Sequence, residues 1–293
     1  MSRRSATLVG FTAVLMWAFL ALFTSASGSV PPFQLAAMSF FIGGLMGAST
    51  WLFRPAALIT LRHQDWRLWA LGIASLFGYH FIYFTAIRNA PPVEVSLIAY
   101  LWPLFLVVFS AFLPGEKLKA HHILGVVLGL FGAVLVITRG QGFGLSEGLK
   151  LGHVLALPCA VIWAGYSVLA RRFGHVPTDV VSGFCLAAAV LSLCSHLLFE
   201  QTVWPQNSIE WLAVAGLGLL PLGAAFYTWD HGLKHGDIMV LGASSYAAPL
   251  LSTLVLLFFG YAQFHWSIAL ACLLISAGAA IPAKDMIFRK SRN

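Results

Sequence analysis

The stretch Ser96-Leu-Ile-Ala-Tyr100-Leu-Trp102-Pro103 lies inside a mostly apolar run that covers residues 93–113. A proline in the middle of a helix removes one backbone hydrogen bond and opens the preceding turn. In a membrane such a defect persists only where the freed carbonyl faces protein or a water-filled cavity. Ser96, Tyr100 and Pro103 follow helical spacing and share one face. A hydroxyl, a phenol and a kink on one face of a membrane helix indicate a functional site.

The tyrosine and the proline recur 146 residues later, in Gly242-Ala-Ser-Ser-Tyr246-Ala-Ala-Pro249. The same offset relates Trp17 to Trp163 and Gly72 to Gly218. A register that is kept over half of the chain indicates an internal duplication. We therefore expect a first repeat at residues 1–139, a linker at 140–151 and a second repeat at 152–293.

The composition is that of an integral membrane protein. Of 293 residues, 59% are hydrophobic and 9% are charged, and the mean hydropathy is +0.86. A soluble protein has about 25% charged residues. The apolar runs have the length of membrane helices rather than that of the ~10-residue strands of outer-membrane barrels, so the expected fold class is all-α. The four cysteines lack CxxC spacing, and we expect buried thiols without a disulfide or a metal.

Ten runs are long enough to span a bilayer, which needs about 20 apolar residues. We expect the first run to be a membrane span rather than a removed signal peptide, because its counterpart around Trp163 lies in mid-chain. The expected spans are 7–26, 32–53, 67–88, 93–113, 120–138, 152–172, 178–199, 210–233, 238–259 and 265–286.

The basic residues predict the orientation of these spans. If the N-terminus is cytoplasmic, fourteen of the 17 Lys and Arg residues lie on the cytoplasmic side, and only Arg88, Arg139 and Lys150 lie outside. The positive-inside rule therefore predicts that both termini are cytoplasmic. It also accounts for the net charge of +7 without a nucleic acid partner. Five spans per repeat is an odd number, so the two repeats are inverted relative to each other, as in many transporters with a central cavity.

Ten spans in two repeats, with a tryptophan in the first helix and a proline in the fourth helix of each, resemble the drug/metabolite transporter superfamily and in particular its EamA-type exporters. The resemblance covers essentially the whole chain. It implies two bundles around a central cavity, export of aromatic and other neutral amino acids, and a bacterial inner-membrane location. The expected partners are a small-molecule substrate and the lipid bilayer, the expected state is a monomer, and no cofactor is implied.

Aromatic side chains with a few polar groups suit a neutral ligand with an apolar body. The ring of an amino acid can lie on aromatic faces, and its carboxylate needs donors such as Tyr100, Trp163, Ser244 or His80. His80 has two interpretations, a transport role or a structural hydrogen bond. The predicted substrate-binding residues are Trp17, Tyr79, His80, Tyr83, Ser96, Tyr100, Trp102, Trp163, Tyr166, Trp229, Ser244 and Tyr246.

Other expectations concern movement and packing. Pro103 and Pro249 are predicted hinges, or otherwise static kinks. Asp230 and Lys234 have the spacing of an ion pair, which we favour over a coupling carboxylate. The small residues at 43 and 47 and at 125, 129 and 132 predict close helix packing, with helix sliding or a dimer contact as the alternative.

The sequence leaves other function classes open. A sugar-phosphate or nucleotide-sugar transporter would usually need buried Arg or Lys in the interior of its spans, and no span interior contains one. A channel would show charged rings or a carbonyl filter. An enzyme would need a nucleophile, an acid–base pair or metal ligands, and His121-His122 has no HExxH context. The preferred substrate and the energy source are not specified by the sequence.

Overall fold

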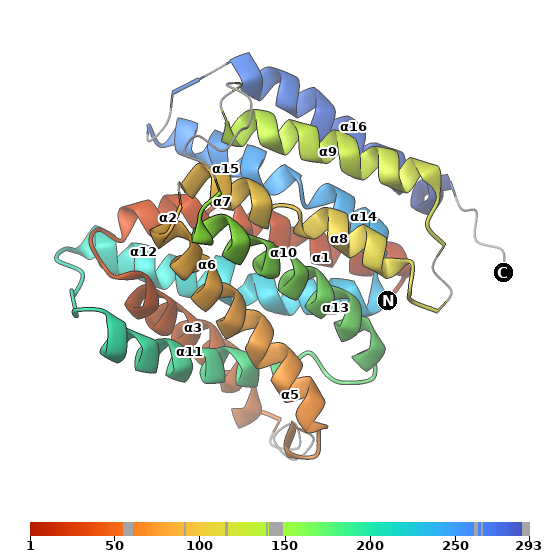
Figure 1. The fold of residues 1–293 in the computed structure, drawn as a ribbon. Helices are drawn as coiled ribbons and strands as arrows, with labels where there is room; N and C mark the ends of the chain where they lie inside the picture. Colours follow the sequence, from red (N-terminus) through yellow and green to blue (C-terminus); the bar gives the residue numbers. More distant parts are fainter. Residues whose placement is uncertain are drawn as a thin grey trace.

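The computed structural model describes residues 1–54, 61–90, 92–114, 117–138, 140, 149–260, 263–264 and 266–288. All secondary structure among these residues is helical (Figure 1). The expected linker lies mostly outside the described residues, because positions 141–148 are not among them.

The first half of the chain forms α1 (Arg3–Trp17), α2 (Leu20–Ala26), α3 (Pro32–Ala48), η1 (Ser49–Leu52), α5 (Trp66–Ile73), η2 (Ala74–Gly78), α6 (Tyr79–Arg88), α7 (Pro92–Ala99), α8 (Trp102–Ser110) and α9 (Ala120–Ile137). The second half forms α10 (Leu151–Ala170), η3 (Arg171–Phe173), α11 (Val180–Phe199), α12 (Ser208–Leu219), η4 (Leu220–Ala224), α13 (Ala225–His235), α14 (Ile238–Ser244), α15 (Ala247–Phe258) and α16 (Trp266–Phe288).

Seven helices among the described residues are long and apolar enough to span a membrane. They are Arg3–Ala26, Pro32–Leu52, Trp66–Arg88, Leu151–Phe173, Val180–Phe199, Ser208–His235 and Ile238–Phe258. The expected fourth span is divided into α7 and α8, and the expected fifth and tenth spans contain the shorter apolar helices Ala120–Leu135 and Trp266–Gly278. An all-helical membrane architecture is therefore confirmed, whereas in the part of the chain that the structure describes seven rather than ten segments meet the length criterion.

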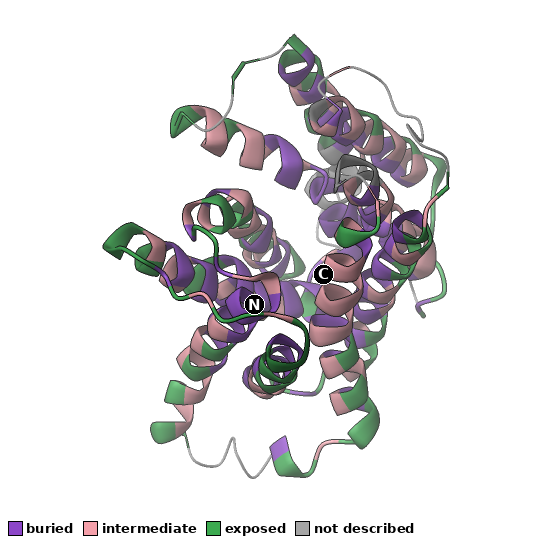
Figure 2. Cartoon of the chain, turned by 60° about the vertical axis from the view of Figure 1, so that its left-hand side comes forward, coloured by how far each residue is buried: buried purple, intermediate pink, exposed green. Residues whose placement is uncertain are grey.

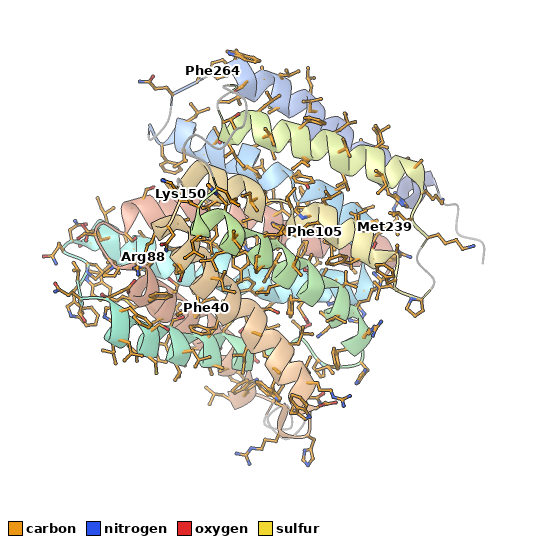
Figure 3. All side chains as sticks on the ribbon, viewed as in Figure 1. Phe40, Arg88, Phe105, Lys150, Met239 and Phe264 are labelled. Atoms are coloured by element: carbon orange, nitrogen blue, oxygen red, sulfur yellow. The ribbon has the colours of Figure 1, made fainter. Side chains whose placement is uncertain are left out.

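Successive long helices run back and forth between two ends of the molecule (Figure 1). We call the end with the N-terminus the N-terminal side and the opposite end the far side. Figure 3 places Met239, at the start of α14, toward the N-terminal side and Arg88 and Lys150 toward the far side.

Both proline regions interrupt their helices, as expected. A turn at Tyr100 and Leu101 separates α7 from α8, and a turn at Ser245 and Tyr246 separates α14 from α15. The backbone carbonyls differ from the expectation. The Ser245 carbonyl accepts a hydrogen bond from the Ala248 amide (3.0 Å), whereas no amide reaches the Ala99 carbonyl among the described residues. The two kinks are therefore equivalent in sequence but not in conformation.

Two π-helical turns were not predicted. They are η2 and η4, and the repeat offset of 146 superimposes residues 74–78 on residues 220–224. Pro221 has no amide hydrogen to continue the α-helical ladder in η4. In η2 the hydroxyl of Ser75 donates to the Leu71 carbonyl (2.5 Å), which competes with the same ladder. Each π-helical turn therefore has a local cause in the sequence, Ser75 in η2 and Pro221 in η4, and these two residues are equivalents under the repeat offset.

Glycines allow the close helix packing that the sequence predicts. A Cβ atom at Gly278 of α16 would lie 2.6 Å from the Gly125 carbonyl oxygen and 2.8 Å from the Gly129 amide nitrogen of α9. A Cβ atom at Gly43 of α3 would lie 2.7 Å from the Leu222 carbonyl oxygen in η4. Backbone contact at these points holds α9 to α16 and α3 to η4.

Polar contacts join α3 and α11 at both ends. On the N-terminal side Arg54 pairs with Asp179 at 2.9 Å. On the far side the Glu200 carboxylate accepts hydrogen bonds from the amides of Phe33 and Gln34, each at 3.1 Å, and pairs with Arg88 at 2.8 Å. The repeat offset relates position 54 to 200 and position 33 to 179, so the two contacts are equivalents.

The two sides differ in packing. On the N-terminal side α8 packs against α14, and a Cβ atom at Gly242 would lie 2.8 Å from Val107 Cγ2. On the far side α7 and α15 share no comparable contact among the described residues. The hydrophobic core divides there into one cluster around Val95 and another around Leu250. Figure 2 shows buried residues gathered in the middle of the bundle and exposed residues at the helix ends.

All four cysteines are free. Cys159 and Cys185 are buried, as expected, whereas Cys272 is only half-buried and Cys194 is exposed on α11, so the expectation of four buried thiols is wrong for Cys194 and met only in part by Cys272. Its helix presents several apolar side chains outward, and Cys194 lies among them.

Candidate functional site

Four tryptophans meet in the middle of the molecule. The ring of Trp17 lies 5.1 Å from that of Trp229, 5.9 Å from that of Trp163 and 6.3 Å from that of Trp102, measured between centroids. Trp102 contacts Trp163 (6.4 Å) and Trp229 (5.7 Å) edge to face. We call Trp17, Trp102, Trp163 and Trp229 the tryptophan cluster.

Helix breaks position this cluster. Trp17 is the last residue of α1, and Trp102 is the first residue of α8, after the turn that precedes Pro103. Trp163 lies within the unbroken α10, and Trp229 lies one turn after η4. The cluster therefore gathers side chains from four helices of both sequence halves, two of them at helix ends.

The four indole N–H groups differ in their hydrogen bonding: two have a partner and two have none among the described residues. Trp17 Nε1 donates to the Pro221 carbonyl (3.1 Å), and Trp229 Nε1 donates to the Ser167 hydroxyl (3.3 Å). Among the described residues the indole nitrogens of Trp102 and Trp163 have no hydrogen-bond partner, and neither is sealed from solvent. Two donors are thus available to a ligand at the cluster.

The predicted tyrosines of the first half lie on the far side of the cluster and are half-buried. The ring of Tyr79 stacks on that of Tyr83 (5.8 Å) and contacts Trp163 (6.0 Å). The hydroxyls of Tyr83 and Ser96 share a hydrogen bond of 3.1 Å. Tyr100 is also half-buried. The structure brings Tyr79, Tyr83 and Ser96 together beside the tryptophan cluster.

His80 makes the structural hydrogen bond that was one of its two interpretations. Its Nδ1 donates to the Leu76 carbonyl at 2.7 Å, inside η2. Its ring lies edge to face with Phe40 (5.1 Å) and Tyr79 (5.3 Å). Among the described residues its Nε2 has no partner, so a transport role through that nitrogen remains a prediction.

The remaining predicted residues are buried on the N-terminal side or beneath the cluster. Tyr166 is 3% exposed and packs on Trp163 (5.5 Å). Ser244 donates to the Leu241 carbonyl (3.1 Å). Tyr246 is fully buried in a separate hydrophobic cluster with Val107 and Val126. Among the described residues Ser244 and Tyr246 make no ring contact or hydrogen bond with the tryptophan cluster, whereas Tyr100 packs against the hydrophobic cluster that contains Tyr246. Both prolines, 103 and 249, are buried.

Sequence reasoning missed two contributors. Phe40 of α3 is fully buried and stacks on Phe226 (6.0 Å), which in turn contacts Trp17 (6.4 Å). No local pattern distinguishes Phe40 from the other aromatic residues of its run. The Pro221 carbonyl was also missed, although a proline inside an apolar run is a signal for a freed backbone group.

The cluster is uncharged and aromatic. The four tryptophans and the rings that contact them, those of Tyr79, Tyr166 and Phe226, are all uncharged, and among the described residues no group of three or more metal-ligating side chains occurs. Aromatic faces with indole and phenol donors can hold an apolar ring and a polar end group. The arrangement therefore suits a small, neutral, aromatic or apolar molecule.

Comparison with known proteins gives a consistent result. The model of the EamA-like transporter family matches the chain twice, at residues 4–138 and 150–282. The chain is 55% identical over 282 residues, 96% of its length, to the aromatic amino acid exporter YddG of Ancylobacter novellus, of which 98% is covered. It is 24% identical to YddG of Escherichia coli (86% of this chain, 88% of the relative) and 25% identical to the pseudopaline exporter CntI of Pseudomonas aeruginosa (94% and 91%).

A solved crystal structure has the same fold. It is 52% identical in sequence, has a TM-score of 0.90, and is matched over 99% of this chain and 100% of its own. The similarity extends over essentially the whole molecule, so the helices that carry the tryptophan cluster belong to a fold that is already known from a crystal structure.

Proposed function

Because this chain belongs to the EamA-like transporter family, we propose that it exports aromatic and other neutral amino acids across a bacterial inner membrane by alternating access. The chain is a multi-pass membrane protein and a transporter rather than an enzyme. The substrate class rests on the relatives named as aromatic amino acid exporters and on the uncharged tryptophan cluster.

The proposed topology has ten spans in two inverted five-helix repeats, with both termini in the cytoplasm. Three observations support it. The family model matches the two halves separately. The helix breaks and the π-helical turns recur at one offset. The basic residues follow the positive-inside rule. The N-terminal side is then cytoplasmic and the far side is external.

With that orientation the conformation is open to the outside. The N-terminal side is closed by α8 against α14, while α7 and α15 stand apart on the far side. Inverted repeats allow the opposite arrangement, because each repeat can adopt the conformation of the other. Export would alternate between these two states around the tryptophan cluster.

The observation that carries the substrate assignment is the pair of available indole donors on Trp102 and Trp163 beside an aromatic wall. A carboxylate can accept from indole N–H groups, and an aromatic side chain gains about 0.5–1.5 kcal/mol from each ring contact beyond its buried area. The ammonium group can lie over a ring face. No buried counter-ion is needed for this mode of binding.

The alternatives fit less well. A sugar phosphate or nucleotide sugar would place two or more negative charges in a site that has no cation among its described residues. A channel would need a continuous path, whereas α8 and α14 close the N-terminal side. A larger metabolite, such as the pseudopaline that one relative is named for exporting, stays an alternative substrate in the same site.

Transport in sealed vesicles tests the proposal. Purified protein in liposomes is expected to catalyse saturable uptake of radiolabelled phenylalanine or tryptophan, because the aromatic wall and the indole donors match those molecules. Glucose 6-phosphate should not be taken up above protein-free vesicles. Repeating the assay with and without an imposed pH gradient shows whether protons are coupled. Absence of any amino acid flux, or equal flux of the phosphate ester, would overturn the assignment.

The proline kinks give a second prediction. Pro103→Ala supplies an amide for the unpaired Ala99 carbonyl, and that bond is worth about 1 kcal/mol, which corresponds to roughly fivefold slower exchange. Pro249→Ala should have a smaller effect, because the Ser245 carbonyl already has a partner. Substrate binding should be retained in both variants. Vesicle flux and fluorescence titration measure the two quantities, and unchanged flux in both variants would exclude a hinge role.

A further inference from the structure

The two π-helical turns each free one backbone carbonyl. In a π-helical turn an amide donates to the carbonyl five residues earlier instead of four. Where the α-helical pattern resumes, one carbonyl therefore receives no amide from its own helix. In η4 the Ala225 amide donates to the Leu220 carbonyl, five residues earlier, and the next carbonyl, that of Pro221, accepts the indole N–H of Trp17 (3.1 Å). That bond connects α1 to the helix that contains η4, two helices from different halves of the chain.

The same pair of groups exists a second time, without the bond. The repeat offset relates Pro221 to Ser75 in η2, and Trp17 to Trp163 in α10. Among the described residues no side chain donates to the Ser75 carbonyl, and the Trp163 indole nitrogen has no partner. Helix α10 packs directly against η2, as α1 packs against η4. The two members of the second pair therefore lie on elements that pack together, and among the described residues neither the Ser75 carbonyl nor the Trp163 indole N–H has a side-chain partner.

The backbone around the two tryptophans also differs. Helix α1 ends at Trp17, and the chain turns at Ala18 and Phe19 before α2 begins. Helix α10 continues past Trp163 to Ala170 without a break. Two equivalent segments thus adopt two conformations, one with the indole bonded to a π-helical turn and one without it.

We propose that Trp163 and the Ser75 carbonyl form a second latch, which closes when the far side closes and the bond between Trp17 and Pro221 opens. The inference rests on the proposed alternating access, in which each repeat takes the conformation of the other. One indole N–H is bound to a π-helical turn in each state, and the other is available at the cluster. The available donor therefore changes from Trp163 in the state seen here to Trp17 in the opposite state.

Phenylalanine substitutions test the latch, because they keep an aromatic ring and remove the N–H. Spin labels at Asn89 and Phe258, both exposed on the far side, report its opening, and labels at Lys117 and His235 report the N-terminal side. Trp17→Phe should reduce the ratio of far-side-open to far-side-closed molecules about three- to fivefold, and Trp163→Phe should raise it by a similar factor. Trp66→Phe, a 72% exposed position, is the matched control and should leave the distances unchanged.

Opposite shifts support the latch, and shifts in the same direction, or none, overturn it. A second measurement does not depend on how well the variants fold. In protein cross-linked closed through Asn89→Cys and Phe258→Cys, indole ¹⁵N NMR should show the Trp17 N–H released and the Trp163 N–H bonded. Unchanged indole signals would also overturn the latch. These readouts need no substrate, so a failure here is distinct from a failure to transport amino acids.

Discussion

Asp230→Ala is expected to lower the stability of the folded protein by about 3–5 kcal/mol, because it leaves the ammonium of Lys234 buried without its counter-ion. Both side chains are nearly inaccessible, with exposures of 2% for Asp230 and 1% for Lys234, and their charged atoms lie 2.7 Å apart. The hydroxyl of Thr178 donates to the carboxylate (2.8 Å), and Lys234 donates to the Val176 carbonyl (3.1 Å). The network fixes the end of α13 to the segment before α11.

Thermal unfolding in detergent, with the folded fraction measured by size-exclusion chromatography, determines this loss of stability. The double variant Asp230→Leu with Lys234→Met should recover most of it, because a buried pair can be replaced by apolar side chains at little cost. Arg54→Ala is the matched control. It breaks a pair of similar length (2.9 Å) whose arginine is 60% exposed, and it should cost less than about 1 kcal/mol.

The same variants decide whether the carboxylate couples transport. If the double variant is stable and still accumulates substrate with the same response to a pH gradient, the pair has a structural role. A stable double variant that transports but has lost its gradient response would instead make Asp230 a coupling group, against the prediction.

Much of the fold follows from patterns that survive in a linear sequence. Apolar runs of membrane length predicted the long helices, and the offset between Tyr100-Leu-Trp-Pro103 and Tyr246-Ala-Ala-Pro249 predicted two matching helix breaks, which are present. Trp17 and Trp163 were both predicted to bind substrate, and the structure places their rings 5.9 Å apart. These features depend on residue type and spacing, which the sequence displays directly.

Other features depend on backbone choices that leave no such pattern. An α-helical and a π-helical turn have the same apolar composition and differ only in the carbonyl that each amide selects, so η2 and η4 were not foreseen. Glu200 was missed for a similar reason, since two of its partners are the main-chain amides of Phe33 and Gln34.

The conformational state is a third kind of information that the sequence lacks. Tyr100 and Tyr246 are equivalents in the duplicated pattern, yet Tyr100 is half-buried and Tyr246 is fully buried. Two inverted repeats of one sequence can exchange their conformations. The sequence therefore predicts which residues form the pair, and only a structure tells which member is accessible in a given state.

Trp163→Ala is expected to reduce the rate of amino acid transport at low substrate concentration by roughly thirtyfold or more. Its ring contacts Trp17, Trp102, Tyr79 and Phe226 at centroid distances of 5.7–6.4 Å, and its N–H is one of the two available donors. Loss of one hydrogen bond and of the aromatic surface for the substrate removes about 2–4 kcal/mol of binding free energy, which corresponds to this factor or a larger one.

Further variants show whether the Trp163 ring contacts substrate or only packs in the hydrophobic core. Trp163→Phe restores a ring and should recover transport to within about fivefold of the unchanged protein, the cost of one hydrogen bond. Trp211→Ala is the control, since that ring is 47% exposed and packs only on Trp204 among the described aromatic residues.

A structural role of Trp163 in the packed core would give another result. Trp163→Ala would then unfold, at about 3–5 kcal/mol for a buried tryptophan, and the folded fraction that remained would transport normally. Vesicle flux divided by the amount of folded protein distinguishes the two outcomes: a fall in this ratio with Trp163→Ala, together with its recovery in Trp163→Phe, assigns the ring to the substrate.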